Sequence, residues 1–109
     1  VGAYIRGYLY RREARKAELV TGRAVLYFPT IEALLAKYNM PQQLKYLPVV
    51  ESALDPHAIS PVGAEGLWQF MPGTAADYGL KVNDYVDERR DPHKSTEAAI
   101  HYLKKAYEK

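Results

Sequence analysis

The sequence contains no cysteine in its 109 residues. This absence excludes a disulfide scaffold and a thiolate metal site, and it leaves the cellular compartment open. No run approaches 18 consecutive apolar residues, and the N-terminus lacks the hydrophobic stretch of a signal peptide. If the natural protein is exported, we expect its targeting segment to have been removed. The seven glycines and seven prolines are scattered and no repeat is visible, so we expect one domain over residues 1–109.

An excess of charge of one sign is also missing, because 15 basic residues face 13 acidic ones and the net charge is +2. The basic residues nevertheless crowd the first quarter of the chain: Arg6, Arg11, Arg12, Arg15, Lys16 and Arg23. A nucleic-acid-binding surface needs base-reading side chains and groove-sized geometry, and neither is evident. We interpret the cluster as the solvated face of a helix, with attraction to an anionic polymer as the alternative.

Apolar residues recur mostly at three- and four-residue steps, which predicts a mainly α fold. The predicted helices cover residues 3–19, 29–39, 42–53, 74–78 and 92 onward. Gly22 is a predicted helix end and Pro29 a predicted helix start, whereas Pro48 predicts a bend or break inside its run. Asp91 is the predicted N-cap of the last helix. The buried side of that helix is predicted to contain Ala98, Tyr102, Leu103 and Ala106.

The helical pattern is interrupted once, near residues 58–70. Short apolar stretches flank Pro61-Val62-Gly63, which is typical of a turn joining two short extended segments. Residues 82–90 are rich in polar side chains and are predicted to form a loop. The sequence therefore predicts a helical domain with one small β excursion.

Glu51 is the carboxylate with the most unusual predicted surroundings. It follows an apolar helical run and lies near Leu47, Val50 and Leu54. Poor solvation among such side chains would raise the pKa of the carboxyl, as a general acid for a glycosidic oxygen requires. From composition alone, an ordinary glutamate that faces water at a helix end remains the commoner explanation.

The segments around Glu51 carry a recognisable pattern. It consists of Glu51-Ser52-Ala53-Leu54-Asp55-Pro56, then Ser60-Pro61-Val62-Gly63-Ala64, then Gly66-Leu67-Trp68-Gln69-Phe70-Met71-Pro72, with Val86-Asp87-Glu88-Arg89-Arg90-Asp91-Pro92 further on. This pattern resembles the lytic transglycosylase family with its lysozyme-like catalytic domain, and within it the membrane-bound D type. The resemblance runs from about Ala3 to the last residue, and it implies a lysozyme-like fold.

The resemblance also implies roles for individual residues. Glu51 would act first as catalytic acid and then as base in cleaving the β-1,4 bond between N-acetylmuramic acid and N-acetylglucosamine, with a 1,6-anhydro product. The implied substrate-binding residues are Ser60, Gln69, Met71, Gly66, Ser52 and Tyr78. In this interpretation Ser60 positions the substrate, Gln69 and Met71 contact the N-acetyl region, and Gly66 lets the backbone approach the glycan. Trp68 is interpreted as a core residue, with stacking on a sugar as the alternative.

A hydrolase of the usual kind would need a second carboxylate, whereas the implied reaction needs one. Asp55 is too close to Glu51 in sequence to face it across a cleft unless the loop folds back. Glu65, fourteen residues after Glu51, could lie opposite it, but we interpret Glu65 as a solvated loop residue. His57, His93 and His101 lack the spacing of metal ligands, so we expect no metal and no cofactor.

The resemblance implies further expectations about the whole protein. The chain stops before the Ala-Tyr-Asn-x-Gly motif of the family, so we expect a domain that lacks its C-terminal part and self-associates through the surface left uncovered. The expected partner is the peptidoglycan glycan strand, not nucleic acid. The expected location is the periplasm or cell envelope, with an outer-membrane anchor in the full-length protein. A non-catalytic peptidoglycan-binding or assembly fragment is the alternative function.

Overall fold

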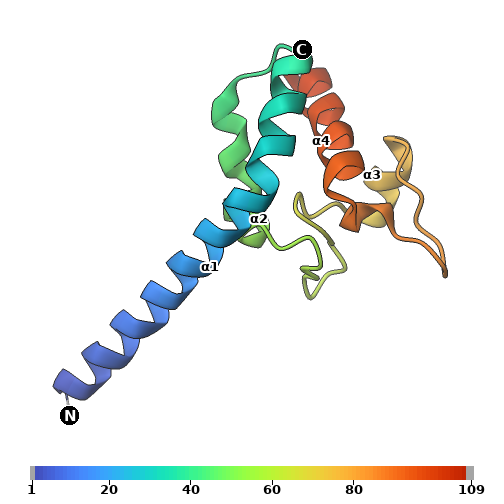
Figure 1. Ribbon diagram of the computed structural model, residues 1–109. Coiled ribbons are helices and arrows are strands. Elements are labelled where there is room, and N and C mark those ends of the chain that lie inside the picture. Colours follow the sequence, from blue (N-terminus) through green and yellow to red (C-terminus); the bar gives the residue numbers. More distant parts are fainter. Residues whose placement is uncertain (1, 108–109) are drawn as a thin grey trace.

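The computed structural model describes the backbone of residues 2–107 and the side chains of residues 14–107. The elements in chain order are α1 (Gly2–Lys37), η1 (Gln42–Tyr46), α2 (Leu47–Ser52), α3 (Pro72–Asp77), η2 (Glu88–Arg90) and α4 (Pro92–Tyr107) (Figure 1). The η elements are 3₁₀-helices. The C-terminal half of α1 packs against α4 and η1, while its N-terminal half projects away from the body (Figure 1). The mainly helical fold predicted from the periodicity is confirmed.

The first two predicted helices are one continuous helix. We predicted an end at Gly22 and a new start at Pro29, and both predictions are wrong, because α1 runs through both residues. Glycine inside a helix costs only about 1 kcal/mol relative to alanine, and Pro29 is exposed, with its ring on the outside. Just beyond it, Ile31 and Leu35 are fully buried, and this packing offsets the lost hydrogen bond.

Part of α1 is apolar enough to be compared with a membrane-spanning helix. In the described residues, Ala14–Lys37 has the length and composition of a helix that crosses a membrane. Its last third, however, supplies Ile31, Leu34 and Leu35 to the core of the folded body. Arg15 and Lys16 are exposed, as expected for a solvated helix face, whereas the side chains of Arg6, Arg11 and Arg12 lie outside the described residues.

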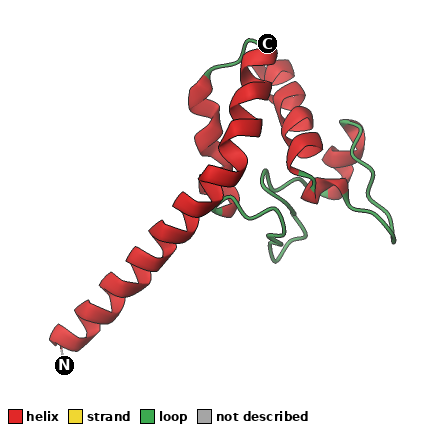
Figure 2. Cartoon of the chain, viewed as in Figure 1, coloured by secondary structure: helices red, strands yellow, loops and turns green. Residues whose placement is uncertain are grey.

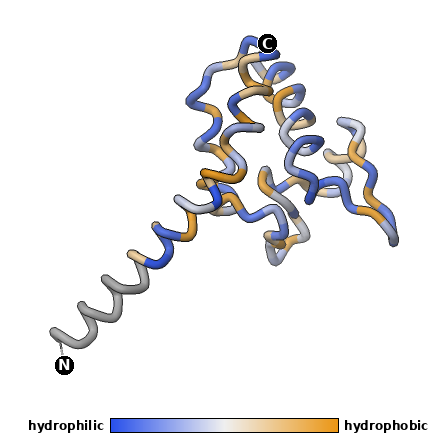
Figure 3. The backbone as a smooth tube through the Cα atoms, viewed as in Figure 1, coloured by the Kyte–Doolittle hydropathy of each residue, from blue (hydrophilic) through white to orange (hydrophobic). Residues whose placement is uncertain are grey.

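Two clusters of buried side chains form the core. The first joins α1 to α4 through Ile31, Leu34, Leu35, Leu54, Leu67 and Ile100. The second consists of Phe70, Ala75, Leu80, Ala98 and Ala99. Trp68 packs against both clusters, and its Nε1 donates a 2.9 Å hydrogen bond to Thr96 Oγ1. In the hydropathy view, apolar stretches lie where α1 joins the body (Figure 3).

The buried side of α4 differs from the prediction. Ala98 is buried as expected, but Tyr102 is 45% exposed and Ala106 is exposed. Ile100 and Ala99 take the inner positions instead. The start of the helix is as predicted, because Asp91 Oδ1 accepts a 2.9 Å hydrogen bond from the backbone N–H of Lys94.

The region between α2 and α3 contains the predicted β excursion. Isolated antiparallel bridges join Ile59 to Glu65 and Glu65 to Phe70, and within the described range no pairing is long enough to count as a strand (Figure 2). The predicted turn is present, because Gly63 has a φ of +91° and its N–H donates to the Ser60 carbonyl at 3.0 Å. These bridges fold the chain back beside α2 and α4.

Two further predictions concern segments next to the site. The break at Pro48 is confirmed, because a 3₁₀-helix ends at Tyr46 and α2 begins at Leu47. The prediction of a simple polar loop at residues 82–90 is wrong. That segment contains a bridge between Val82 and Asp87 and the 3₁₀-helix η2, in which Arg89 is buried with 5% of its surface exposed.

Candidate active site

A pocket of about 330 Å³ opens beside the end of α2. Its lining comes from α2, the segment before α3, α3 itself and α4: Leu47, Glu51, Trp68, Gln69, Phe70, Met71, Thr74, Ala99, Tyr102 and Leu103. We call residues 47–52 the α2 wall and residues 66–71 the loop wall. Glu51 is the one acidic residue in this lining.

Glu51 stands in the last turn of α2, at the surface of the pocket. Its neighbour Val50 is 82% exposed and Leu47 is 37% exposed, so the apolar surroundings expected from the sequence are incomplete among the described residues. These side chains therefore do not shield the carboxyl from water, and the commoner alternative considered from composition, a glutamate that faces water at a helix end, describes Glu51. The helix stops here because Ala53 and Leu54 both adopt left-handed backbone conformations, with φ of +53° and +60°.

Left-handed conformations at residues with a Cβ are strained, and they persist where the surrounding structure enforces them. Here Leu54 is fully buried in the first core cluster. Arg23 of α1 donates a 3.1 Å hydrogen bond from Nη1 to the carbonyl of Ala53. Ser52 Oγ lies 2.9 Å from the Pro48 carbonyl and 2.8 Å from the Leu67 carbonyl. Ser52 therefore links the α2 wall to the loop wall and does not line the pocket.

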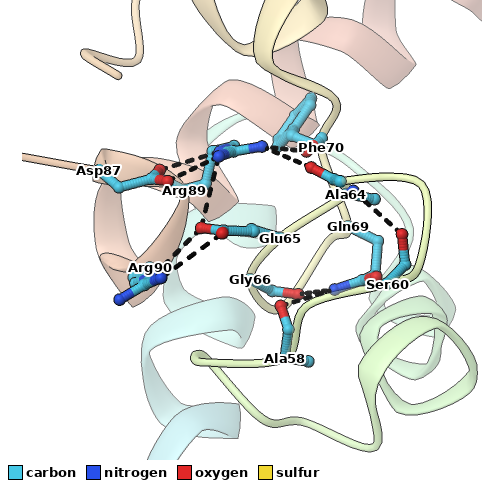
Figure 4. A network of polar contacts seen from close by, with 11 residues as sticks. Ala58, Ser60, Ala64, Glu65, Gly66, Gln69, Phe70, Asp87, Arg89 and Arg90 are labelled. Atoms are coloured by element: carbon cyan, nitrogen blue, oxygen red, sulfur yellow. Dashed lines mark hydrogen bonds and ion pairs between the residues drawn. The ribbon is translucent and has the colours of Figure 1, made fainter. Parts of the chain in front are cut away.

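On the loop wall, Gln69 also has a left-handed conformation, with a φ of +52°. Its Nε2 donates hydrogen bonds to the carbonyls of Ala58 at 3.2 Å and Gly66 at 2.9 Å (Figure 4). Both amide protons are thus engaged within the chain, and the amide oxygen keeps its acceptor capacity. The next residue but one, Met71, lines the same pocket and is 43% exposed.

Besides Ser52, three more predicted binding residues lie outside the pocket lining. Ser60 Oγ accepts hydrogen bonds from the backbone N–H groups of Val62 and Ala64, at 3.3 and 3.0 Å, and so closes the turn. Gly66 is buried, and a Cβ there would lie 1.9 Å from the carbonyl oxygen of Arg89. The close approach that glycine permits is therefore made by this chain's own backbone. Tyr78 lines a separate pocket of about 250 Å³.

The two alternative carboxylates are both bound to arginines. Asp55 lies 3.9 Å from Arg23 and is not among the residues that line the pocket. Glu65 lies 3.4 Å from Arg89 and 3.2 Å from Arg90, and its side chain is only 13% exposed. The interpretation of Glu65 as a solvated loop residue is wrong, because the bridges of the β excursion turn it toward η2.

Trp68 combines the two alternatives considered for it. It contacts both core clusters, as the core interpretation requires, and it also contributes to the pocket. Its indole N–H is used by Thr96, so its remaining exposed surface is aromatic. The pocket residues that the sequence reasoning missed are Leu47 as a lining residue, Phe70, Thr74, Ala99, Tyr102 and Leu103. The i, i+3, i+4 spacing of the last three on α4 was the available signal.

Arg89 is the other residue that was missed. It supports the loop wall from η2, and the hydrogen bonds from its guanidinium hold the pKa of Asp87 down, at about 2. In turn the Asp87 carboxylate raises the pKa of Arg89. Among the described residues, no group of three or more His, Cys, Asp and Glu side chains has the geometry to hold a metal ion.

With this geometry established, comparison with known proteins identifies the class. Residues 28–109 match the family described as Transglycosylase SLT domain, and the chain belongs to that family. The resemblance noted in the motifs is thereby confirmed.

The individual relatives are more specific. The chain is 44% identical over 96 residues, 88% of its length, to membrane-bound lytic murein transglycosylase D of Escherichia coli (strain K12). The same values hold for the protein of that name from Escherichia coli O6:H1 (strain CFT073). It is 32% identical over 83 residues to a protein from Alteromonas sp. (strain M-1) whose name refers to tributyltin chloride resistance, covering 76% of this chain and 40% of that protein. The chain spans 21% of the Escherichia coli relatives.

Proposed function

We propose that this chain carries the catalytic acid of a peptidoglycan lytic transglycosylase. The observation that supports this most is the position of Glu51, the one carboxylate in the pocket lining, with Asp55 and Glu65 each held by an arginine elsewhere. Most glycoside hydrolases place two carboxyl groups about 5–10 Å apart across the scissile bond. A single acid favours a reaction in which the sugar supplies its own nucleophile.

The proposed reaction cleaves the β-1,4 bond between N-acetylmuramic acid and N-acetylglucosamine. Protonated Glu51 donates its proton to the glycosidic oxygen, and the bond from that oxygen to C1 of the muramic acid breaks. The resulting carboxylate then accepts the proton of the C6 hydroxyl, whose oxygen forms the new bond to C1. The products are a 1,6-anhydromuramic end and a free N-acetylglucosamine hydroxyl, and Glu51 recovers its proton.

The loop wall would orient the sugar against Glu51. We assign the free acceptor oxygen of Gln69 to a hydroxyl or N-acetyl N–H of the glycan, and Met71 to the acetyl methyl group. We assign indirect roles to the predicted residues outside the lining. Ser52 and Ser60 would hold the two walls in place through their hydrogen bonds to backbone groups, whereas Gly66 would leave space for the backbone carbonyl of Arg89. Tyr78 would support the pocket through Tyr102, whose ring lies edge-on to it at 5.6 Å.

The test is a product analysis. Incubation with purified sacculi, followed by mass spectrometry of the soluble fragments, should yield 1,6-anhydro muropeptides. Ordinary reducing ends would contradict the proposed reaction and return attention to a second carboxylate. The assay is best run on this chain and on the full-length protein together, because the chain spans about a fifth of its Escherichia coli relatives.

One observation favours a non-catalytic alternative, in which the chain binds or assembles on peptidoglycan without turnover. The pocket is open to solvent at Met71, which lines it and is 43% exposed. Misplacement of a substrate by about 1 Å reduces rates on the order of a hundredfold. Retention on sacculi without any release of fragments would support this alternative against catalysis.

The expected setting follows from the same proposal. We propose action in the periplasm or cell envelope, where peptidoglycan lies, with an outer-membrane anchor in the full-length protein; the support is the membrane-bound relatives. We also propose self-association through the exposed apolar residues beside the pocket and the end of α4, among them Val50, Met71 and Tyr102. Sedimentation equilibrium should show a dimer at high concentration, and a monomer throughout would contradict it.

A further inference from the structure

A buried ionic cluster contacts the loop wall from η2. Its centre is Arg89, whose side chain is 6% exposed. Nε and Nη2 of Arg89 donate to the two carboxylate oxygens of Asp87, at 2.9 and 2.6 Å. The same guanidinium lies 3.4 Å from Glu65, which also pairs with Arg90. Figure 4 shows Arg89 between Asp87 and the loop wall, with Glu65 between the two arginines.

The remaining contacts of Arg89 reach backbone, and they hold both ends of one segment. Nη1 donates to the carbonyl of Gly63 at 2.9 Å and to that of Phe70 at 3.1 Å. Between these two points lies the turn that carries Trp68 and Gln69. Phe70 also closes that turn with Glu65, because each donates its N–H to the other's carbonyl at 3.1 Å. One side chain therefore sets the separation between Gly63 and Phe70, and the segment between them contains most of the loop wall.

The backbone of Arg89 makes a further contact with the same segment. Its carbonyl oxygen occupies the place where a Cβ on residue 66 would be, 1.9 Å from that position. Gly66 in turn accepts the Gln69 side-chain amide at 2.9 Å. A shift of η2 would thus be transmitted to Gln69 through Gly66, and to Phe70 through the guanidinium.

Buried ion pairs are weak contributors to net stability, because desolvation of the charges opposes their attraction. Burial of two apolar side chains, Leu67 and Phe70, already holds the segment to the core. The cluster instead fixes the geometry of the segment, because a planar guanidinium donates hydrogen bonds to carbonyls and carboxylates in fixed directions. Geometry, more than stability, is therefore the property that depends on Arg89.

We propose that Arg89 is a positioning residue for the glycan pocket. It acts by fixing the loop wall, so that Gln69 and Met71 face Glu51 at the separation that a sugar needs. This inference deepens the proposed function and rests on it for its activity readout. Its structural readout, the conformation of Gln69, does not depend on that function.

The test compares Arg89→Lys with Arg90→Lys. Arg90 is a matched control, because it pairs with the same Glu65 but its side chain is 42% exposed and it donates to neither end of the segment. Lysine keeps the charge at position 89 and loses the fork that reaches Asp87 and two carbonyls. The measurements are the side-chain amide NMR signals of Gln69, thermal unfolding, and KM and kcat on a soluble oligosaccharide of alternating N-acetylglucosamine and N-acetylmuramic acid.

We expect Arg89→Lys to shift the Gln69 amide signals and to raise KM at least about tenfold. A tenfold effect is within the range that misplacement of a substrate by a fraction of 1 Å produces. Arg90→Lys should leave the signals in place and KM within twofold. Unchanged Gln69 signals in folded Arg89→Lys would overturn the proposal. If no variant or wild-type protein acts on the oligosaccharide, the proposed function fails, and the NMR comparison still decides the role of Arg89.

A second variant covers the case in which Arg89→Lys does not fold. The triple change Arg89→Met, Asp87→Asn, Glu65→Gln removes the buried charges together, so no buried ion is left unpaired. We expect a folded protein in which the Gln69 signals are shifted and KM remains raised. Wild-type signals and KM in that folded protein would mean that packing alone positions the loop wall.

Discussion

On the α2 wall of the pocket, the candidate acid stands at the end of a six-residue helix, whereas the loop wall opposite is tied into a buried ionic cluster. The α2 wall ends in two strained residues, Ala53 and Leu54, and Glu51 itself is exposed. On the loop wall, the Gln69 amide donates to the carbonyls of Ala58 and Gly66, and the Phe70 carbonyl accepts from Arg89. The candidate acid is thus exposed to solvent, while the wall opposite is tied to the body by side-chain hydrogen bonds.

The largest expected effect tests the α2 wall. Glu51→Gln should lower the rate of sacculus cleavage by about 100- to 10,000-fold, because general acid catalysis supplies a factor of that size. Because Glu51 is exposed, the unfolding temperature of the variant should stay close to that of the wild type. Product assay and calorimetry measure the two properties. Glu51 would not be the acid if substantial turnover persisted.

The next effect tests the loop wall. Gly66→Ala should destabilise the fold by about 3 kcal/mol or more, because the new Cβ meets the Arg89 carbonyl at 1.9 Å and the φ of +87° disfavours a side chain. Gly22→Ala is the matched control. Gly22 has open space around its Cβ position in α1, so the same change there should stabilise by up to about 1 kcal/mol. Chemical denaturation of both variants decides the matter; similar effects at the two glycines would contradict it.

A third prediction concerns pH. The pKa of Asp87 falls from 3.8 to about 2 on folding, chiefly through its hydrogen bonds with Arg89. A lowered pKa in the folded state stabilises the protein above pH 3.8, and this contribution disappears as the pH falls toward 2. Asp87→Asn should therefore lower the free energy of unfolding by on the order of 2 kcal/mol near pH 6. The difference in this free energy between the variant and the wild type should shrink below about pH 3.

The control for this pH dependence is Asp84→Asn, at an exposed position of the same segment. Its free energy of unfolding should follow the wild-type curve at every pH. If the Asp87 variant instead differed from wild type by the same amount from pH 6 to pH 2, the ion pair with Arg89 would not be the cause. Urea titrations at several pH values provide the measurement.

The smallest effect tests the link between the walls. Ser52→Ala removes the hydroxyl between the Pro48 and Leu67 carbonyls and should destabilise the fold by about 1 kcal/mol. Thr21→Ala is its control, since that hydroxyl bonds the Ala17 carbonyl on the exposed face of α1 and its loss should be nearly neutral. Equal effects in denaturation experiments would show that the link between the walls is unimportant.

Much of the site was predictable because motifs and local rules report on it. The helix start at Asp91, the break at Pro48 and the turn at Gly63 follow from capping and backbone preferences, which act over a few residues. Glu51, Gln69 and Met71 were selected by their spacing in the motifs, and the structure places all three on one pocket. Their catalytic and binding roles remain predictions.

Long-range contacts account for what the sequence did not reveal. The continuity of α1 through Gly22 and Pro29 depends on the burial of Ile31 and Leu35 against other elements. The burial of Glu65 depends on arginines about 25 residues away, and nothing in its own segment signals that partnership.

By itself, the sequence determined the helical class, the family and the residues of the motif, because periodicity and motif spacing are properties of the chain. The tertiary structure alone decided that Glu51 is the carboxylate in the pocket lining while Asp55 and Glu65 are held elsewhere by Arg23 and Arg89. The physical reason is that whether a carboxylate stays free for chemistry depends on which cations the fold brings within about 4 Å of it.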